Sequence, residues 1–143
     1  MRTVPSVPPL EMAKAMSSTI SSNYPLADEP EKVGAFPAEV SSGGGYFFDK
    51  VLEYRVWVRN KDRSLDIYSF ATYEEALRFR NQSEGAEFPL ALVYQAEYIA
   101  EPEVGEFVHI KQPRMAEWQV KWLLGNRRNE TSIDNFLKAN VKK

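Results

Sequence analysis

Apolar and polar side chains alternate through residues 54–59 of this 143-residue chain. In an extended strand successive side chains point to opposite faces, so this alternation predicts a strand that is buried on one side. Three residues form the predicted core face: Tyr54, Val56 and Val58. Three others form the opposite face: Arg55, Trp57 and Arg59.

A hairpin and a helix are predicted to follow this strand. The polar run 60–64 is typical of a turn, and the β-rich run 65–70 is placed to pair with the first strand. Thr72 stands three residues before Glu75, which is the spacing of a capping box, so a helix is expected to begin directly after Thr72. Gly85 is expected to end this helix in the left-handed conformation.

Two stretches farther along the chain predict additional strands. The run 90–95 is almost continuously apolar, which is typical of a strand buried on both faces. Residues 107–110 predict the next strand, and residues 101–106 between the two have the composition of a turn.

Residues 118–124 admit two interpretations. Their alternation fits a strand with Trp118 and Trp122 on one face, whereas a helix would also bring both tryptophans into one stripe. We favour the strand. Thr131, three residues before Asp134, then predicts the start of a short C-terminal helix.

These elements predict an α+β domain over residues 46–143, in the order ββαββ(β)α, with an antiparallel sheet of four to five strands and one helix packed on a face. The aromatic residues 46–48 predict either a short first strand or an aromatic plug against the sheet. Residues 1–45 hold six of the nine prolines and few large apolar side chains, so they predict a disordered arm. The run Gly43–Gly45 is interpreted as a hinge at the edge of the domain.

Composition excludes several classes of protein. The chain has no cysteine, which excludes disulfide bonds, thiolate zinc sites and cysteine nucleophiles. No apolar run approaches the ~18–20 residues needed to cross a bilayer, and the N-terminus has no signal-peptide pattern. We therefore expect a cytoplasmic protein with no membrane partner.

Charge is unevenly distributed along the chain, although the net charge is only −2. Residues 46–110 carry seven basic and twelve acidic side chains, whereas residues 111–143 carry eight basic and three acidic side chains. Such a basic segment can bind an anionic partner or fold back on the acidic part of its own chain, and we favour the second interpretation. The pI of about 5.5 also argues against a nucleic-acid partner.

Catalytic chemistry finds little support in the residue types present. His109 is the only histidine, so no cluster of histidines can bind a metal, and a lone histidine in an alternating strand is usually structural or at the surface. The run Gly43–Gly45 lacks the Lys-Ser/Thr pair that follows in a P-loop. The sequence therefore predicts no catalytic residue, no metal ligand and no cofactor.

Aromatic and basic side chains indicate a binding surface instead. Rings beside arginines on a sheet can bind a protein partner or stack nucleic-acid bases. The candidate interaction surface has six members: Arg55, Trp57, Arg59, Trp118, Lys121 and Trp122. The alternative is that the helix covers this face, with the tryptophans in the core and the arginines reaching out at its rim.

Four segments carry a resemblance to known proteins: Tyr54–Trp57, Phe70–Leu77, Gly85–Glu87 and Glu117–Leu123. With them, residues 46–128 resemble a group of short bacterial proteins, found mainly in alphaproteobacteria, some of which carry the label GNAT-type N-acetyltransferase. That label implies acetyl-CoA binding. Acetyltransferases of that fold hold the pyrophosphate with a Gln/Arg-x-x-Gly-x-Gly/Ala loop that opens a helix, and this sequence has no such loop, so no catalytic residue transfers by position.

The leading prediction is a small non-catalytic protein that acts through contacts with another protein, in an accessory or regulatory role. One alternative is an acetyl-CoA-dependent N-acetyltransferase-like protein or a degenerate relative of one. The other is a protein that binds nucleic acid through the basic C-terminal segment.

Overall fold

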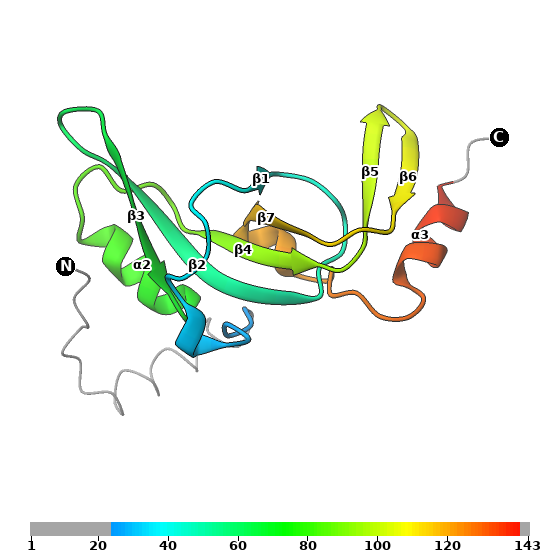
Figure 1. Ribbon diagram of the computed structural model, residues 1–143, viewed down its shortest axis with the longest axis horizontal. Helices are drawn as coiled ribbons and strands as arrows, with labels where there is room; N and C mark the ends of the chain where they lie inside the picture. Colours follow the sequence, from blue (N-terminus) through cyan, green and yellow to red (C-terminus); the bar gives the residue numbers. More distant parts are fainter. Residues whose placement is uncertain (1–23, 141–143) are drawn as a thin grey trace.

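The computed structural model describes residues 24–140 and has the predicted α+β architecture, in which a mixed five-stranded sheet carries helices and a separate two-stranded hairpin (Figure 1). The strands of the sheet are β1 (Ser41–Ser42), β2 (Lys50–Arg59), β3 (Leu65–Phe70), β4 (Leu90–Gln95) and β7 (Arg114–Gln119). The hairpin consists of β5 (Tyr98–Glu103) and β6 (Glu106–Ile110). The helices are the 3-10 helices η2 (Pro30–Lys32) and η3 (Val120–Leu123) and the α-helices α2 (Tyr73–Asn81) and α3 (Ser132–Ala139).

The strands of the sheet lie in the order β1-β7-β4-β2-β3. Neighbouring strands are antiparallel as predicted, except that the short β1 pairs with β7 in parallel. The prediction of a strand over residues 118–124 is wrong for most of its length, because β7 covers Arg114–Gln119 and the chain then turns into η3. This turn buries Val120 and Leu123, three residues apart, against the core.

One face of the sheet forms the hydrophobic core, and β2 contributes the three residues that the alternation predicts. Tyr54 and Val56 are fully buried and Val58 nearly so. A bulge between Val51 and Glu53 shifts the register of β2 against β4, so Val51 also joins the core cluster. Helix α2 packs on this face of β2 and β3, and its Ala76 is fully buried.

Helix α2 begins where the capping box predicts. The hydroxyl of Thr72 accepts a hydrogen bond from the backbone N–H of Glu75 at 3.1 Å. The helix ends at Asn81, before Gly85. Gly85 is indeed left-handed, with φ of +81°, but its carbonyl accepts a hydrogen bond from the N–H of Arg59 and so anchors the end of β2.

The prediction of a disordered arm through residue 45 is wrong for its described part. Residues 24–42, which we call the strap, begin beside α2, where the ring of Tyr24 contacts that of Tyr73. Residues 34–38 of the strap then lie on the sheet face opposite α2, and the strap ends as strand β1 beside β7. The N–H groups of Ala27 and Asp28 donate hydrogen bonds to the carbonyls of Ala71 and Val51. Composition misses the strap because it is held mainly by main-chain hydrogen bonds. The rest of the predicted arm, residues 1–23, lies outside the described part of the chain.

The predicted hinge is a closely packed loop. The N–H of Gly43 donates to the carbonyl of Glu117, and the carbonyl of Gly44 accepts from the indole of Trp118 at 3.1 Å. All three glycines have positive φ, and a Cβ on Gly45 would lie 2.7 Å from Arg114. The loop therefore needs glycine for its shape and its close packing.

Hairpin β5–β6 is an insertion between two strands, β4 and β7, that are paired with each other. Gln95, the last residue of β4, pairs with Arg114, the first residue of β7, and the hairpin occupies the chain between them. The predicted turn is shorter than expected, because β5 extends to Glu103 and only residues 104–105 form the turn. Figure 1 shows the hairpin standing away from the sheet beside α3.

The aromatic residues 46–48 form a plug, which is one of the two predicted alternatives. Phe48 is buried and meets Trp118 edge to face at 5.8 Å between ring centroids. Tyr46 stacks on Phe136 of α3 at 4.6 Å and also contacts Phe107 of β6. The plug therefore joins the sheet to the hairpin and to α3.

Among the described residues, no helix combines the length and the apolar character that a membrane span requires.

We expect Gly85→Ala to lower the free energy of unfolding by about 2–4 kcal/mol, because φ of +81° strains any residue with a Cβ and the new carbon would lie 2.3 Å from the carbonyl oxygen of Arg59. Gly125→Ala is the matched control, since Gly125 has φ of +78° and no atom within 4 Å of the added carbon. Its cost should be about 1 kcal/mol. Urea unfolding measures both, and equal costs would contradict the close approach.

We expect Tyr54→Phe to reduce the loss of stability at alkaline pH. Burial raises the pKa of Tyr54 well above its ordinary value of 10.0, and its hydroxyl donates a hydrogen bond to the carbonyl of Pro25. The folded state therefore resists ionisation, so this stability is present below about pH 10 and falls as pH rises toward the folded pKa. Urea unfolding between about pH 8 and pH 11 should show a shallower decline in the free energy of unfolding for the variant than for the wild type. Parallel declines of the two proteins would contradict this account.

Candidate functional site

The face of β2 opposite the core is covered, so the predicted surface of Arg55, Trp57 and Arg59 is not one open patch. Arg55 is fully buried, Trp57 is half-buried and Arg59 is exposed. The helix does not provide the cover, contrary to the alternative interpretation, because α2 packs on the other face. The strap does.

Arg55 lies at the centre of a buried ionic cluster. Its Nε donates to Oε2 of Glu53 at 2.7 Å, and its Nη1 donates to Oε2 of Glu117 on β7 at 2.8 Å. The indole N–H of Trp57 reaches the same oxygen of Glu117 at 3.0 Å. Glu53 and Glu117 both lie opposite Leu92 in the sheet, which brings the two carboxylates to either side of one guanidinium.

Main-chain groups of the strap complete this cluster. The carbonyls of Pro37 and Ala38 accept hydrogen bonds from the Arg55 guanidinium. The N–H of Gly34 donates to Oε1 of Glu53 at 2.7 Å. All three groups lie on the strap, so the cluster and the strap hold each other in place.

The other predicted surface residues are separated from this cluster. Trp118 is buried in the core and contacts Trp122, which is partly buried against the same cluster. Lys121 lies between them in η3 and is exposed. The two tryptophans are therefore core residues, which was the alternative interpretation for them.

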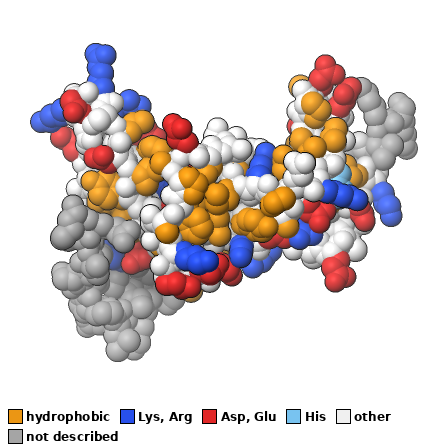
Figure 2. Space-filling view, in the orientation of Figure 1, with side chains coloured by type: hydrophobic (Ala, Val, Ile, Leu, Met, Phe, Trp, Pro, Cys, Tyr) orange, Lys and Arg blue, Asp and Glu red, His pale blue; other side chains and the backbone are white. Residues whose placement is uncertain are grey.

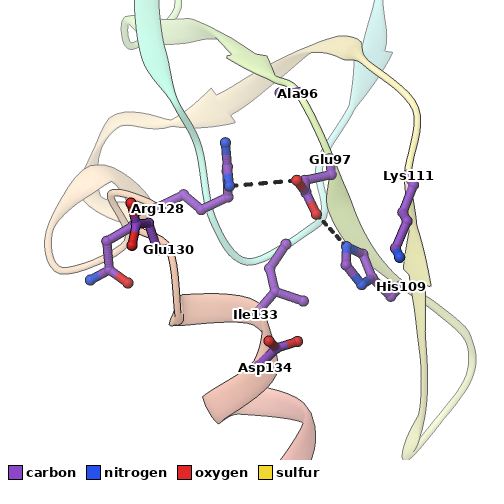
Figure 3. Close-up of a pocket in the computed structure, with 9 residues that line it drawn as sticks. Ala96, Glu97, His109, Lys111, Arg128, Glu130, Ile133 and Asp134 are labelled. Atoms are coloured by element: carbon purple, nitrogen blue, oxygen red, sulfur yellow. Dashed lines mark hydrogen bonds and ion pairs between the residues drawn. The ribbon is translucent and has the colours of Figure 1, made fainter.

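A second cluster of polar side chains surrounds a hollow between hairpin β5–β6 and α3 (Figure 3). The hollow has a volume of about 380 Å³. Its walls come from the ends of β4 and β6 and from the first turn of α3, and nine residues line it: Ala96, Glu97, His109, Lys111, Arg128, Asn129, Glu130, Ile133 and Asp134.

A chain of ionic contacts forms one wall of the hollow. Nε2 of His109 lies 2.6 Å from Oε1 of Glu97, whose other oxygen lies 3.6 Å from Arg128. Arg128 also donates from Nε to Asp49 at 2.8 Å, and this hydrogen bond raises the pKa of the guanidinium. The basic C-terminal segment thus meets acidic residues of its own chain here, as the favoured interpretation of the charge distribution expects.

Two acidic residues at the start of α3 complete the hollow and make no ion pair within the described part of the chain. Glu130, two residues before α3, and Asp134, in its first turn, are both exposed and both line the hollow. The predicted cap of this helix differs in detail: Asn129 Oδ1 accepts from the N–H of Thr131, and the Thr131 side chain makes no capping bond to the helix. The hollow therefore opens toward solvent with two carboxylates unpaired.

Hairpin β5–β6 also carries acidic and apolar side chains beyond the residues that line the hollow. Figure 2 shows acidic side chains gathered at the end of this projection. The N–H of Gly105 and the hydroxyl of Tyr46 donate to Glu101 and lower its pKa, so it remains ionised. At the tip, Val104 is 96% exposed, and Val108 on β6 is also exposed.

The side chains that line the hollow are mainly charged or polar. None of them is a hydroxyl or a thiol, and the nucleophiles among them are the amine of Lys111, the carboxylates and the imidazole of His109. Within residues 24–140, no three histidine, aspartate or glutamate side chains are grouped so as to hold a metal ion. Neither described α-helix opens from a glycine-rich loop of the kind that holds the acetyl-CoA pyrophosphate.

Sequence reasoning singled out His109 but missed the hollow around it. The chain of ionic contacts that starts at His109 joins residues from different elements: Glu97 follows β4, Arg128 follows η3, and Asp49 precedes β2. The one available signal was the Thr131 and Asp134 pattern, which placed a helix start near a pair of arginines.

Comparison with known proteins gives no relative for this chain: no protein-family model, no curated protein and no solved structure matches it.

We expect Arg55→Met to lower the free energy of unfolding by about 3–5 kcal/mol, because it leaves two buried carboxylates without their cation. Arg59→Met is the matched control on the same strand. The side chain of Arg59 is 59% exposed and its contact with Glu87 is 3.9 Å long, so its loss should change stability by less than about 0.5 kcal/mol. Thermal or urea unfolding compares the two, and similar values would show that the cluster carries no special weight.

Proposed function

We propose that this protein is non-catalytic and acts by binding a basic segment of another protein at the end of the molecule formed by hairpin β5–β6 and α3. The observation that carries the proposal is the hollow with two unpaired carboxylates, Glu130 and Asp134, at the base of a hairpin whose tip exposes Val104. Such a binding protein fits the accessory or regulatory role expected from the residue types.

Charge supports a basic partner. Residues 97–111 and 128–138, which form this end, carry six acidic and three basic side chains. Arg128 is already held between Asp49 and Glu97, so it does not neutralise the carboxylates of α3. A lysine or arginine of a partner entering the hollow would pair with Glu130 and Asp134, and complementary charge of this kind also speeds encounter.

Apolar exposure supports a protein rather than a small ion as the partner. Val104 projects almost completely into water, and Val108 lies on the same hairpin, which stands free of the sheet. An interface commonly combines an apolar centre with a polar rim. Val104 would supply part of that centre, and the acidic residues around it would supply the rim.

The same charges disfavour nucleic acid at this end of the molecule, because phosphate would meet a surface with an excess of carboxylates. An acetyl-CoA-dependent activity draws no support from the described helices, since neither offers a glycine-rich opening for the pyrophosphate.

The test is affinity capture from lysate of the source cells, with the captured proteins identified by mass spectrometry and their binding then measured with purified material. We expect the double variant Glu130→Lys/Asp134→Lys to weaken binding of the partner at least tenfold, and Val104→Asp to weaken it similarly, because each removes one half of the complementarity. Binding should also fall as salt is raised.

The matched control is Glu84→Lys/Glu87→Lys, which makes the same change of charge at exposed positions beyond the other end of β2. It should leave binding unchanged. A partner that binds the hollow variant and the control variant equally well would refute the assignment of this end as the binding site.

A further inference from the structure

The cluster around Arg55 is a second feature that stability alone does not explain. Arg55 and Glu53 are at most 1% exposed, and the side chain of Glu117 is 12% exposed. Buried ion pairs of this kind are often no more stable than well-packed apolar side chains of similar volume. A sheet face that needed only to be covered could be apolar, so the cluster calls for another reason.

The segment that covers the cluster is bound through its backbone. Residues 31–42 include no buried side chain, and most of them are exposed. Their contacts with the cluster are one N–H, from Gly34, and two carbonyls, from Pro37 and Ala38. A carboxylate that takes an N–H and a guanidinium that takes two carbonyls recognise main-chain groups, and the positive φ of Gly34 (+91°) adds a requirement for glycine at that position.

A groove beside this contact has room for a side chain. It has a volume of about 310 Å³ and lies between the strap and the sheet-edge strand β3. Its lining combines strap residues such as Phe36 with Ile67 and Tyr68 of β3. The strap fills the main-chain contacts of the site and leaves this adjoining space open.

We propose that Glu53, Arg55 and Glu117 form a binding site for an uncharged, glycine-containing segment of a partner protein, and that residues 34–38 of the strap occupy it as a resident competitor. The choice of an uncharged segment follows from the resident one, since residues 33–38 carry no charge. The cluster's own cation is already shared between two carboxylates, so a partner needs main-chain groups there and not ions.

This site is separate from the hollow at α3 and does not depend on the function proposed for it. A tethered competitor acts at an effective concentration in the millimolar range, so a partner gains access in proportion to the weakening of the strap. Loosening the strap without touching the cluster is therefore the informative change.

The experiment uses the full chain and a fluorescent synthetic peptide with the sequence of residues 31–40, followed by fluorescence anisotropy. Gly34→Ala strains the strap, because φ is +91°, yet nothing lies within 4 Å of the added carbon, so the fold should persist. We expect the peptide to bind this variant roughly tenfold more tightly than it binds the wild type. A peptide with proline in place of Gly34 lacks the N–H that Glu53 accepts and should bind at least tenfold more weakly.

Gly105→Ala is the matched control, since Gly105 also has positive φ (+84°) and open space around it but lies in the turn of hairpin β5–β6. It should bind the peptide as the wild type does. Equal affinity of the Gly34→Ala variant and the control, or equal affinity for the two peptides, would overturn the proposal.

A measurement on the unmodified protein guards against an effect of the substitution on folding. Saturating peptide should speed hydrogen exchange at the Gly34 amide, because the strap is displaced from Glu53. Unchanged exchange would overturn the proposal. Concentration-dependent dimerisation of Gly34→Ala would overturn it as well, by assigning the site to exchange of straps between two copies.

Discussion

The placement of a single guanidinium constrains how the fold closes. Arg55 is buried in the middle of the sheet, and a charge removed from water must find a partner for each of its donors. Two carboxylates and two main-chain carbonyls accept hydrogen bonds from this guanidinium, and they come from β2, β7 and the strap. Strands that are not neighbours in the sheet and a segment from outside it are therefore held in one register by this contact.

The two faces of the sheet are stabilised by different physics. On the α2 face the contacts are apolar and aromatic, and they tolerate small adjustments as long as volume is conserved. On the strap face the contacts are directional and charged, so they define one arrangement of partners. The bulge between Val51 and Glu53 is where β2 adjusts to serve both faces, because it shifts the alternation by one residue.

Local patterns predicted the parts of the structure that local interactions determine. The alternation through Tyr54 and Val56 identified the core face of β2, and the Thr72 spacing identified the start of α2, because each depends on neighbours in the chain. The strap and the hollow depend on distant partners. Gly34 is held by a carboxylate on β2, and His109 faces Glu97 only because the hairpin folds back, so neither contact leaves a trace in composition or periodicity.

The position of hairpin β5–β6, as an insertion between paired strands, has a consequence for how such a protein can diversify. Gln95 and Arg114 are partners in the ladder between β4 and β7, so the main sheet is complete without the residues between them. Descendants of this chain could change the length or the sequence of that insertion while the strand pairing of the ancestral sheet stayed the same. Changes in what the protein recognises would then accumulate in a region that evolution can vary at small cost to folding.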